Sequence, residues 1–290
     1  MQTTLTIAQW LSEATIRLTA AGIITARLDC QLLLEDCLDI SRAQLLAYPD
    51  TNLSASQQTD LQSQLDRRMH HEPMAYIRGK VEFYGHEMYV DANVLVPRPE
   101  SEALISQLIL LMQTQTTAEV DIIDVGTGSG ALAISAKLAL PLATVLGTDI
   151  DPACLVVAAR NAKNYHLDIA LTADDLLPAR YLRKSNHIAT DTANRRLILL
   201  CNLPYVPDDF PVNIAATREP KRALFGGPDG LNVYRQLFNQ IKLIDDLDAK
   251  PQFILCESLP TQHTELAALA LSFRYNVIAV DDFVQVFRYL

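Results

Sequence analysis

Two segments of the chain combine residue types that could hold a ligand and direct chemistry on it. The first runs from Asp124 to Gly130 and follows an apolar, β-like segment, Val120 to Ile123. Its glycines stand at every second position, so the backbone can approach a ligand closely and adopt φ values that a Cβ would forbid. The helical pattern that follows would aim free N–H groups and a positive dipole end at the same place. This segment predicts a strand, a glycine loop and a helix around a nucleotide-type pocket.

Acidic residues after the next two strand-like segments extend this interpretation. Asp149 ends the apolar segment that begins at Ala143, and an acid at the end of a second strand suits the ribose hydroxyls of a nucleoside. The glycine spacing is G-x-G-x-G, whereas dinucleotide enzymes have G-x-G-x-x-G, which weakens the case for NAD. After a third strand near Ile169 to Leu171, Asp175 could accept from the exocyclic amine of a base and Leu176 could pack on its ring. An ordinary solvated loop explains these two residues equally well.

The second segment, Asn202-Leu203-Pro204-Tyr205, follows the strand-like Leu197 to Leu200. A carboxamide nitrogen is a poor nucleophile because its lone pair is delocalised into the carbonyl, so an enzyme must orient it. The Asn202 side-chain oxygen and the main-chain carbonyl of residue 203 could accept its two N–H groups, and both would repel a carboxylate. Tyr205 could close one face of the amide plane, and no strong base is needed. The plain alternative is an ordinary turn after a strand.

Helical patterns with recognisable start signals fill the N-terminal region. Thr6 with Gln9, and Ser54 with Gln57, have the spacing of capping boxes. Ser41 is placed to cap a short helix between them. No cluster of catalytic side-chain types occurs here, so we expect this region to bind or position something.

From Ala75 the pattern changes to the alternation of strands. Tyr76-Ile77, Val81 to Tyr84 and Glu87 to Val90 predict a β-hairpin that joins two domains. Val96 to Glu102 contains two prolines, which fix φ and make a stiff connector. This connector is either a plain linker or a strap that covers the ligand.

The rest of the chain alternates strand and helix patterns and ends in two strand-like segments, Val277 to Val280 and Val284 to Tyr289. This order predicts an α/β fold with a mostly parallel sheet and one antiparallel edge strand. We expect a helical domain over residues 1–74, a hairpin linker over 75–98 and a catalytic domain over 99–290.

The composition is that of a globular protein without a basic region. The chain has 290 residues, of which 49% are hydrophobic and 20% charged, and its net charge is -10. We therefore expect no direct contact with nucleic acid. Neither the five cysteines nor the histidines have metal-ligand spacing, so reduced thiols and no metal site are expected. A long apolar run and a charged leader are both missing, which predicts a cytoplasmic protein away from membranes.

These segments resemble the class I S-adenosylmethionine (SAM) methyltransferases, and among them the release factor glutamine N5-methyltransferases. The resemblance extends to His71 to Ile77, Val96 to Glu102 and Ala223 to Leu231, and it keeps the order of the family's blocks from the first helix to about residue 245. It implies a Rossmann-like, mostly parallel seven-stranded sheet with a small N-terminal all-α domain joined by a β-hairpin. It also implies methylation of the glutamine in the Gly-Gly-Gln loop of peptide chain release factors, with SAM as the cofactor.

The same resemblance implies which residues form the site. The cofactor would contact Asp124, Gly126, Thr127, Gly128, Ser129, Gly130, Asp149, Asp175, Leu176 and Asn202. The catalytic segment would consist of Asn202, Leu203, Pro204 and Tyr205. The helical domain would recognise the release factor.

The chain departs from the family pattern in ways that keep two other functions open. Leu203 stands where the family has proline, and Asn-Leu-Pro-Tyr is typical of rRNA adenine N6-dimethyltransferases. Residues 256–260 lack the glycine that the family has there, and the C-terminus is short. The alternatives are an adenine N6-methyltransferase acting on rRNA or DNA, and a non-catalytic SAM-binding module. The acidic charge and the N-terminal position of the helical region argue against the first.

Overall fold

The computed structural model describes residues 5–113, 119–179, 195–245, 247 and 249–290. Contacts divide the chain into two compact units. One unit is Met1–Lys80 together with Val212–Arg218, and the other is Val81–Pro211 together with Glu219–Leu290. As a division by role, the three segments 1–74, 75–98 and 99–290 stay a prediction.

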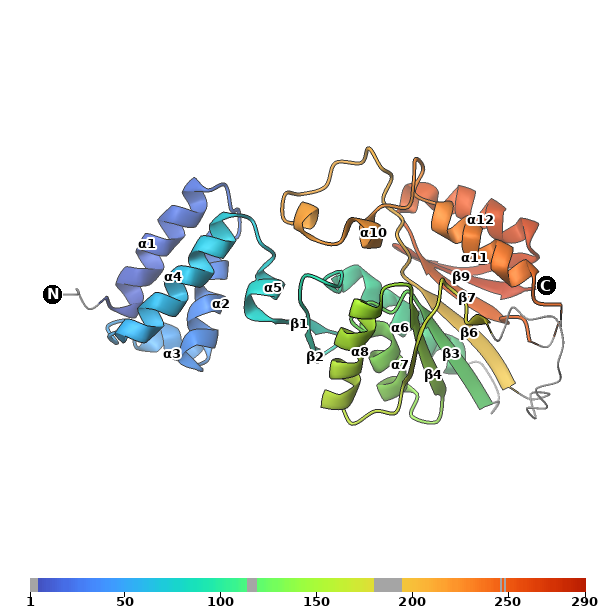
Figure 1. Cartoon of the computed structure of the whole chain (residues 1–290), viewed down its shortest axis with the longest axis horizontal. Coiled ribbons are helices and arrows are strands. Elements are labelled where there is room, and N and C mark those ends of the chain that lie inside the picture. Colours follow the sequence, from blue (N-terminus) through green and yellow to red (C-terminus); the bar gives the residue numbers. More distant parts are fainter. Residues whose placement is uncertain (1–4, 114–118, 180–194, 246, 248) are drawn as a thin grey trace. The chain divides into compact units, whose positions relative to one another are not determined.

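The N-terminal unit is built from α-helices (Figure 1). Three of them begin at capping boxes, as expected, in which Thr6, Ser41 and Ser54 each accept from the backbone N–H three residues on. These caps satisfy N–H groups that a helix start leaves without partners. The helices are α1 (Ile7–Ala20), α2 (Ala26–Leu38), α3 (Arg42–Ala47), α4 (Ala55–Met69) and α5 (Met74–Arg78), and the short η2 (Ala216–Arg218) also belongs to this unit.

The prediction that Tyr76 and Ile77 are extended was wrong, because both lie on α5. Pro73 precedes the helix, and Gly79 ends it with φ of 69°, a left-handed conformation that glycine adopts without strain. Two alternating residues are too few to specify a strand against such flanking signals. The β-hairpin itself forms from β1 (Lys80–Phe83) and β2 (His86–Tyr89).

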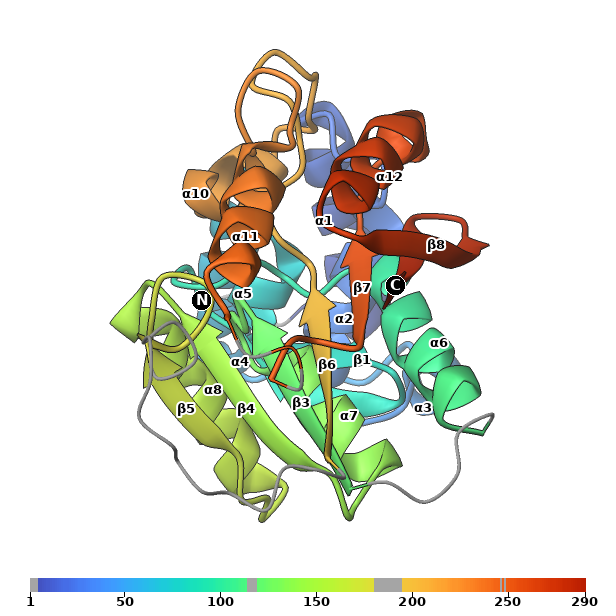
Figure 2. The same cartoon turned by 90° about the vertical axis from the view of Figure 1, so that its right-hand side faces the viewer.

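A seven-stranded sheet forms the centre of the larger unit, in the order β5-β4-β3-β6-β7-β9-β8 (Figure 2). The expected α/β class is confirmed. The antiparallel strand, however, is β9, which pairs with both β7 and β8, so β8 and not β9 forms the edge. The strands are β3 (Glu119–Val125), β4 (Thr144–Asp149), β5 (Ala170–Ala173), β6 (Arg195–Cys201), β7 (Phe253–Glu257), β8 (Tyr275–Asp281) and β9 (Val284–Tyr289).

Helices cover both faces of this sheet because successive strand residues point to opposite sides. Ile122 and Ile198 pack with the helices of one face, whereas Ile123 and Leu199 pack with those of the other. The first face carries α6 (Glu102–Gln113), α7 (Ala131–Ala139) and α8 (Pro152–Asn164), and the second carries α11 (Asn232–Lys242) and α12 (His263–Ser272). Short turns of helix, η1 (Pro99–Ser101), α10 (Lys221–Leu224) and η3 (Pro260–Gln262), lie in the connections.

Within the described ranges, no helix has the length and apolar character needed to cross a bilayer. The same residues contain no group of three or more histidine, cysteine or acidic side chains that could hold a metal ion.

Candidate active site

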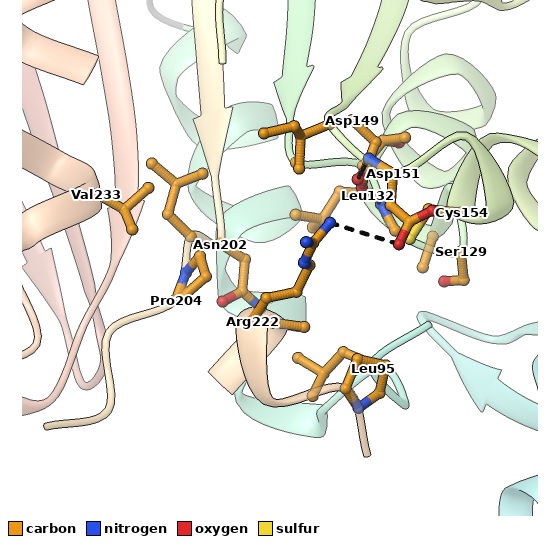
Figure 3. A pocket seen from close by; sticks show the side chains of 18 of the residues that line it. Leu95, Ser129, Leu132, Asp149, Asp151, Cys154, Asn202, Pro204, Arg222 and Val233 are labelled. Carbon is orange, nitrogen blue, oxygen red and sulfur yellow. Dashed lines mark hydrogen bonds and ion pairs between the residues drawn. The ribbon is translucent and has the colours of Figure 1, made fainter. Parts of the chain in front are cut away.

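A cavity of about 340 Å³ lies in the larger unit where β3, β4 and β6 end. Its size is within the range of small-molecule sites, and the carboxyl ends of parallel strands are where α/β sheets bind ligands. Figure 3 shows Asn202 and Pro204 on one side of the cavity and Asp149, Asp151 and Cys154 on the other. Predicted site residues that line it are Gly126, Thr127, Gly128, Ser129, Asp149, Asp175, Leu176, Asn202, Leu203 and Pro204.

The glycine loop presents bare backbone to this cavity. Gly126 and Gly128 have φ of 74° and 54°, values that side chains disfavour. A Cβ built on Gly128 would meet no heavy atom within 4 Å, so it would project into open space beside the cavity. The Thr127 N–H is held by the carbonyl of Thr148 at 2.7 Å, which ties the loop to the end of β4.

Asp124 and Gly130, two predicted cofactor contacts, are not among the residues that line the cavity. The buried Asp124 carboxylate accepts from the Thr127 hydroxyl at 2.6 Å and from the Ala133 N–H at 3.1 Å. Gly130 begins α7 with φ of 81°, and a Cβ there would lie 3.1 Å from that of Ala158. Both residues therefore support the conformation of the glycine loop without lining the cavity.

Burial raises the pKa of Asp124 to about 7, against an ordinary value of 3.8. The folded state therefore keeps a proton that the unfolded chain loses, and this stabilisation disappears as the pH rises towards 7. We expect the free energy of unfolding to fall by on the order of a few kcal/mol between about pH 5 and about pH 7. Asp124→Asn cannot titrate and should fall less over the same range. Denaturant unfolding across pH measures both slopes, and equal slopes would contradict the prediction.

Asp149 holds the loop through both carboxylate oxygens. One accepts from the Gly128 N–H and the other from the Asp151 N–H, each at 2.9 Å. Each oxygen keeps acceptor capacity, because a carboxylate can accept about four hydrogen bonds. Asp149 therefore both shapes the glycine loop and can receive hydroxyl groups from the cavity.

The loop after β5 is held in place by Thr148 and Gln240. The Thr148 hydroxyl donates to the Leu176 carbonyl at 2.7 Å, and the Gln240 side chain bonds the carbonyl of Asp175 and the N–H of Leu177. Leu176 has φ of 68°, which is unusual for a side-chain-bearing residue. These contacts place Asp175 and Leu176 at the wall of the cavity.

Asn202 follows the end of β6 and lines the cavity, and its side-chain nitrogen donates to the Ser101 hydroxyl at 2.7 Å. Leu203 is only 2% exposed and packs into the apolar cluster against Gly126, so this departure from the family's proline fills the core. Tyr205 is not among the lining residues. Its hydroxyl donates instead to the buried Glu257 at 2.8 Å.

Glycines in the following loop let it approach the Asn202–Tyr205 segment closely. A Cβ on Gly226 would lie 2.3 Å from the Pro204 carbonyl oxygen, and one on Gly230 would lie 2.0 Å from that of Tyr205. The Gln262 side chain donates to the carbonyls of Tyr205 and Asp229, which joins the two segments.

Gly230→Ala should therefore lower the free energy of unfolding far more than alanine does at an ordinary glycine with a left-handed backbone conformation. We expect it to lower the free energy of unfolding of the larger unit by roughly 3 kcal/mol or more, because it adds backbone strain to a clash. Gly85→Ala is the matched control. Its φ of 74° is similar, but no heavy atom lies within 4 Å of the added Cβ, so a loss of about 1 kcal/mol is expected. Denaturant titrations compare the two, and equal losses would refute the close approach.

Several lining residues were not predicted. Pro97 and Ser101 come from the connector that the sequence left as either linker or strap, and Leu95 directly precedes it. All three line the cavity. Arg222, 65% exposed, forms an ion pair of 3.6 Å with Asp151 (Figure 3). The dense glycine and proline content around Arg222 was the only sequence signal that this loop could reach a site. Its pairing with Asp151, which is distant in sequence, follows only from the folded chain.

The lining chemistry fits SAM. Four aspartates and one arginine give the wall a net negative charge, which suits a ligand with a positive sulfonium and ammonium group. Bare glycine backbone, a carboxylate with free acceptor capacity and apolar side chains such as Leu132 and Leu176 suit its methionine, ribose and adenine parts in turn.

Comparisons with known proteins identify the family of the chain. Residues 9–79 match the model of the PrmC N-terminal domain, and residues 106–191 match that of ribosomal protein L11 methyltransferase (PrmA). A release factor glutamine methyltransferase of Koribacter versatilis is 33% identical over 240 residues, covering 82% of this chain and 81% of the relative. Proteins of the same name from Coxiella burnetii and Moorella thermoacetica are each 35% identical, covering 75% and 80% of this chain and 74% and 79% of the relatives. The chain therefore belongs to the release factor glutamine methyltransferase family.

Proposed function

We propose that this protein transfers a methyl group from SAM to N5 of the glutamine in the Gly-Gly-Gln motif of peptide chain release factors. The name that its relatives share supports the release factor and its glutamine as substrate. The observation that carries the proposal is the Asn202 amide, whose nitrogen already donates to Ser101. Its oxygen is therefore left to accept from a substrate N–H at the cavity wall.

In this proposal the chain acts by orientation. Asn202 Oδ1 and the carbonyl of Leu203 each accept one N–H of the glutamine amide, which fixes its plane and raises electron density at nitrogen. The same oxygens repel the carboxylate of glutamate and so select glutamine. The chain needs no strong base, because the nitrogen becomes acidic once it has been methylated. Tyr205 supports the segment from outside the cavity through Glu257.

SAM, when bound, supplies a methyl group activated by a positively charged sulfur. The backbone of Gly126 to Ser129 would hold its methionine part and Asp149 its ribose hydroxyls. Asp175 and Leu176 would contact the adenine. Asp124 and Gly130 would act indirectly, by fixing the loop.

Mass spectrometry of a release factor after incubation with the protein and SAM tests this function. The Gly-Gly-Gln peptide should gain one methyl group on the glutamine side chain. Tritiated SAM with naked rRNA or DNA in place of the release factor tests the adenine N6 alternative, and label in nucleic acid alone would overturn the proposal. Calorimetry with SAM addresses the non-catalytic alternative: binding without methylation of any of these substrates would favour it.

We further propose that the helical segment 1–74 recognises the release factor, in the cytoplasm where translation ends. Its surface exposes large apolar side chains, including Ile16, Ile24 and Tyr48, as protein-binding surfaces do. Serine at these three positions should lower kcat/KM for the intact factor and leave that for a short Gly-Gly-Gln peptide unchanged. An equal loss on both substrates would refute this role.

A further inference from the structure

Outside the glycine loop, the Asn202 side chain contacts Ser101, and Glu257 ends the neighbouring strand. Cys201 and Cys256 are paired in register on the parallel strands β6 and β7. The residues that follow them, Asn202 and Glu257, therefore reach the same edge of the sheet. Ser101, at the end of η1, is 2% exposed and accepts from Asn202 Nδ2 at 2.7 Å.

The direction of these hydrogen bonds follows from the chemistry of each group. An amide NH2 only donates, so the Ser101 oxygen must accept from Asn202, and the single Ser101 proton is left for another partner. Glu257 is fully buried, and one of its oxygens accepts from Tyr205. The other oxygen, Oε2, is buried and has no hydrogen-bond partner placed on it among the described residues. A hydrogen bond from the Ser101 hydroxyl lowers the pKa of the Glu257 carboxyl and so stabilises its ionised form.

We propose that Ser101 and Glu257 are positioning residues that orient the Asn202 amide for catalysis. The Glu257 carboxylate accepts a hydrogen bond from the Ser101 hydroxyl, whose oxygen accepts from Asn202 Nδ2. Asn202 Oδ1 is thereby turned to the substrate. A flipped amide would offer N–H groups, which cannot accept from a glutamine amide. This inference rests on the proposed function, in which Asn202 Oδ1 accepts from the substrate.

The ionisation of Glu257 gives the arrangement a pH dependence. Burial raises the pKa of Glu257 to about 7, while the Ser101 and Tyr205 hydroxyls lower it. From the connector, the charge of Glu100 raises the pKa of Glu257 and the charge of Arg98 lowers it. The uncharged Tyr234 of α11 contacts its main-chain carbonyl. Above this pKa the carboxylate accepts a hydrogen bond from the Ser101 hydroxyl and thereby fixes the Asn202 amide through Ser101, so kcat should rise as the pH passes about 7.

The test compares Ser101→Ala, Ser101→Thr and Glu257→Gln with the unchanged protein, using a release factor as substrate. Ser101→Ala should lower kcat by about ten- to a hundredfold, which corresponds to one lost buried hydrogen bond. Its affinity for SAM should change by less than about threefold. Ser101→Thr keeps the hydroxyl and should restore most of kcat. Glu257→Gln should lower kcat and remove its rise near pH 7.

Ser135→Ala is the control for loss of a buried hydroxyl, because Ser135 lies on α7, is 1% exposed and does not line the cavity. It should leave kcat and its pH profile unchanged. Thermal unfolding of each variant separates misfolding from misorientation. The inference is overturned if Ser101→Ala keeps full kcat, if Ser101→Thr is as impaired as Ser101→Ala, or if Glu257→Gln keeps the rise near pH 7. If Asn202→Ala is also fully active, the proposed function fails with it; if Asn202→Ala alone is inactive, only the positioning role fails.

Discussion

Asn202→Ala should lower kcat for release factor methylation by about a hundred- to a thousandfold, the usual effect of removing one side chain that stabilises a reacting group. Alanine takes away the proposed side-chain acceptor and leaves the main-chain carbonyl of Leu203, so the substrate amide would keep only one of the two hydrogen bonds that orient it. Loss of the Asn202 side chain also removes its hydrogen bond of 2.7 Å to the Ser101 hydroxyl. Steady-state kinetics on a release factor, followed by mass spectrometry of the glutamine, measures the effect.

Asn276→Ala is the matched control for Asn202→Ala. Asn276 is an exposed residue on β8 and is not among those lining the cavity. This variant should keep the kcat of the unchanged protein. A kcat for Asn202→Ala within about threefold of the control would remove the acceptor role from Asn202.

Asp149→Ala should weaken SAM binding by about ten- to a hundredfold, which is the value of one or two hydrogen bonds to a charged group. The carboxylate holds the N–H groups of Gly128 and Asp151 at 2.9 Å. Its loss would therefore remove the proposed contact with the ribose of SAM and would also loosen the glycine loop. Isothermal titration with SAM measures the dissociation constant directly.

Asp168→Ala provides the comparison for Asp149→Ala, because it removes an exposed acid that does not line the cavity. It should leave the affinity for SAM unchanged. Asp149→Asn is an intermediate variant, because its side-chain amide can accept through one oxygen. Its affinity for SAM should lie between those of Asp149→Ala and Asp168→Ala. Unchanged SAM affinity in Asp149→Ala would exclude the ribose contact and leave only the bracing of the loop.

The sequence by itself determined the features that depend on neighbours along the chain. Capping boxes at Thr6, Ser41 and Ser54 form where side chain and backbone are three residues apart. The glycine loop follows an apolar strand and precedes a helix, so its place at the carboxyl edge of the sheet follows from the order of elements. Asp149 ends a strand, Asp175 and Asn202 each follow one, and parallel strands bring their ends together.

Only the tertiary structure decided contacts between distant segments. Ser101 and Asn202 are 101 residues apart, and no local pattern pairs them. Asp124 and Gly130 belong to the glycine segment in sequence, yet they do not line the cavity. The Asp124 carboxyl group instead accepts from Thr127 and Ala133, and Gly130 lies against Ala158. Side-chain direction and strand register set such contacts, and both are fixed only when the sheet and its helices pack.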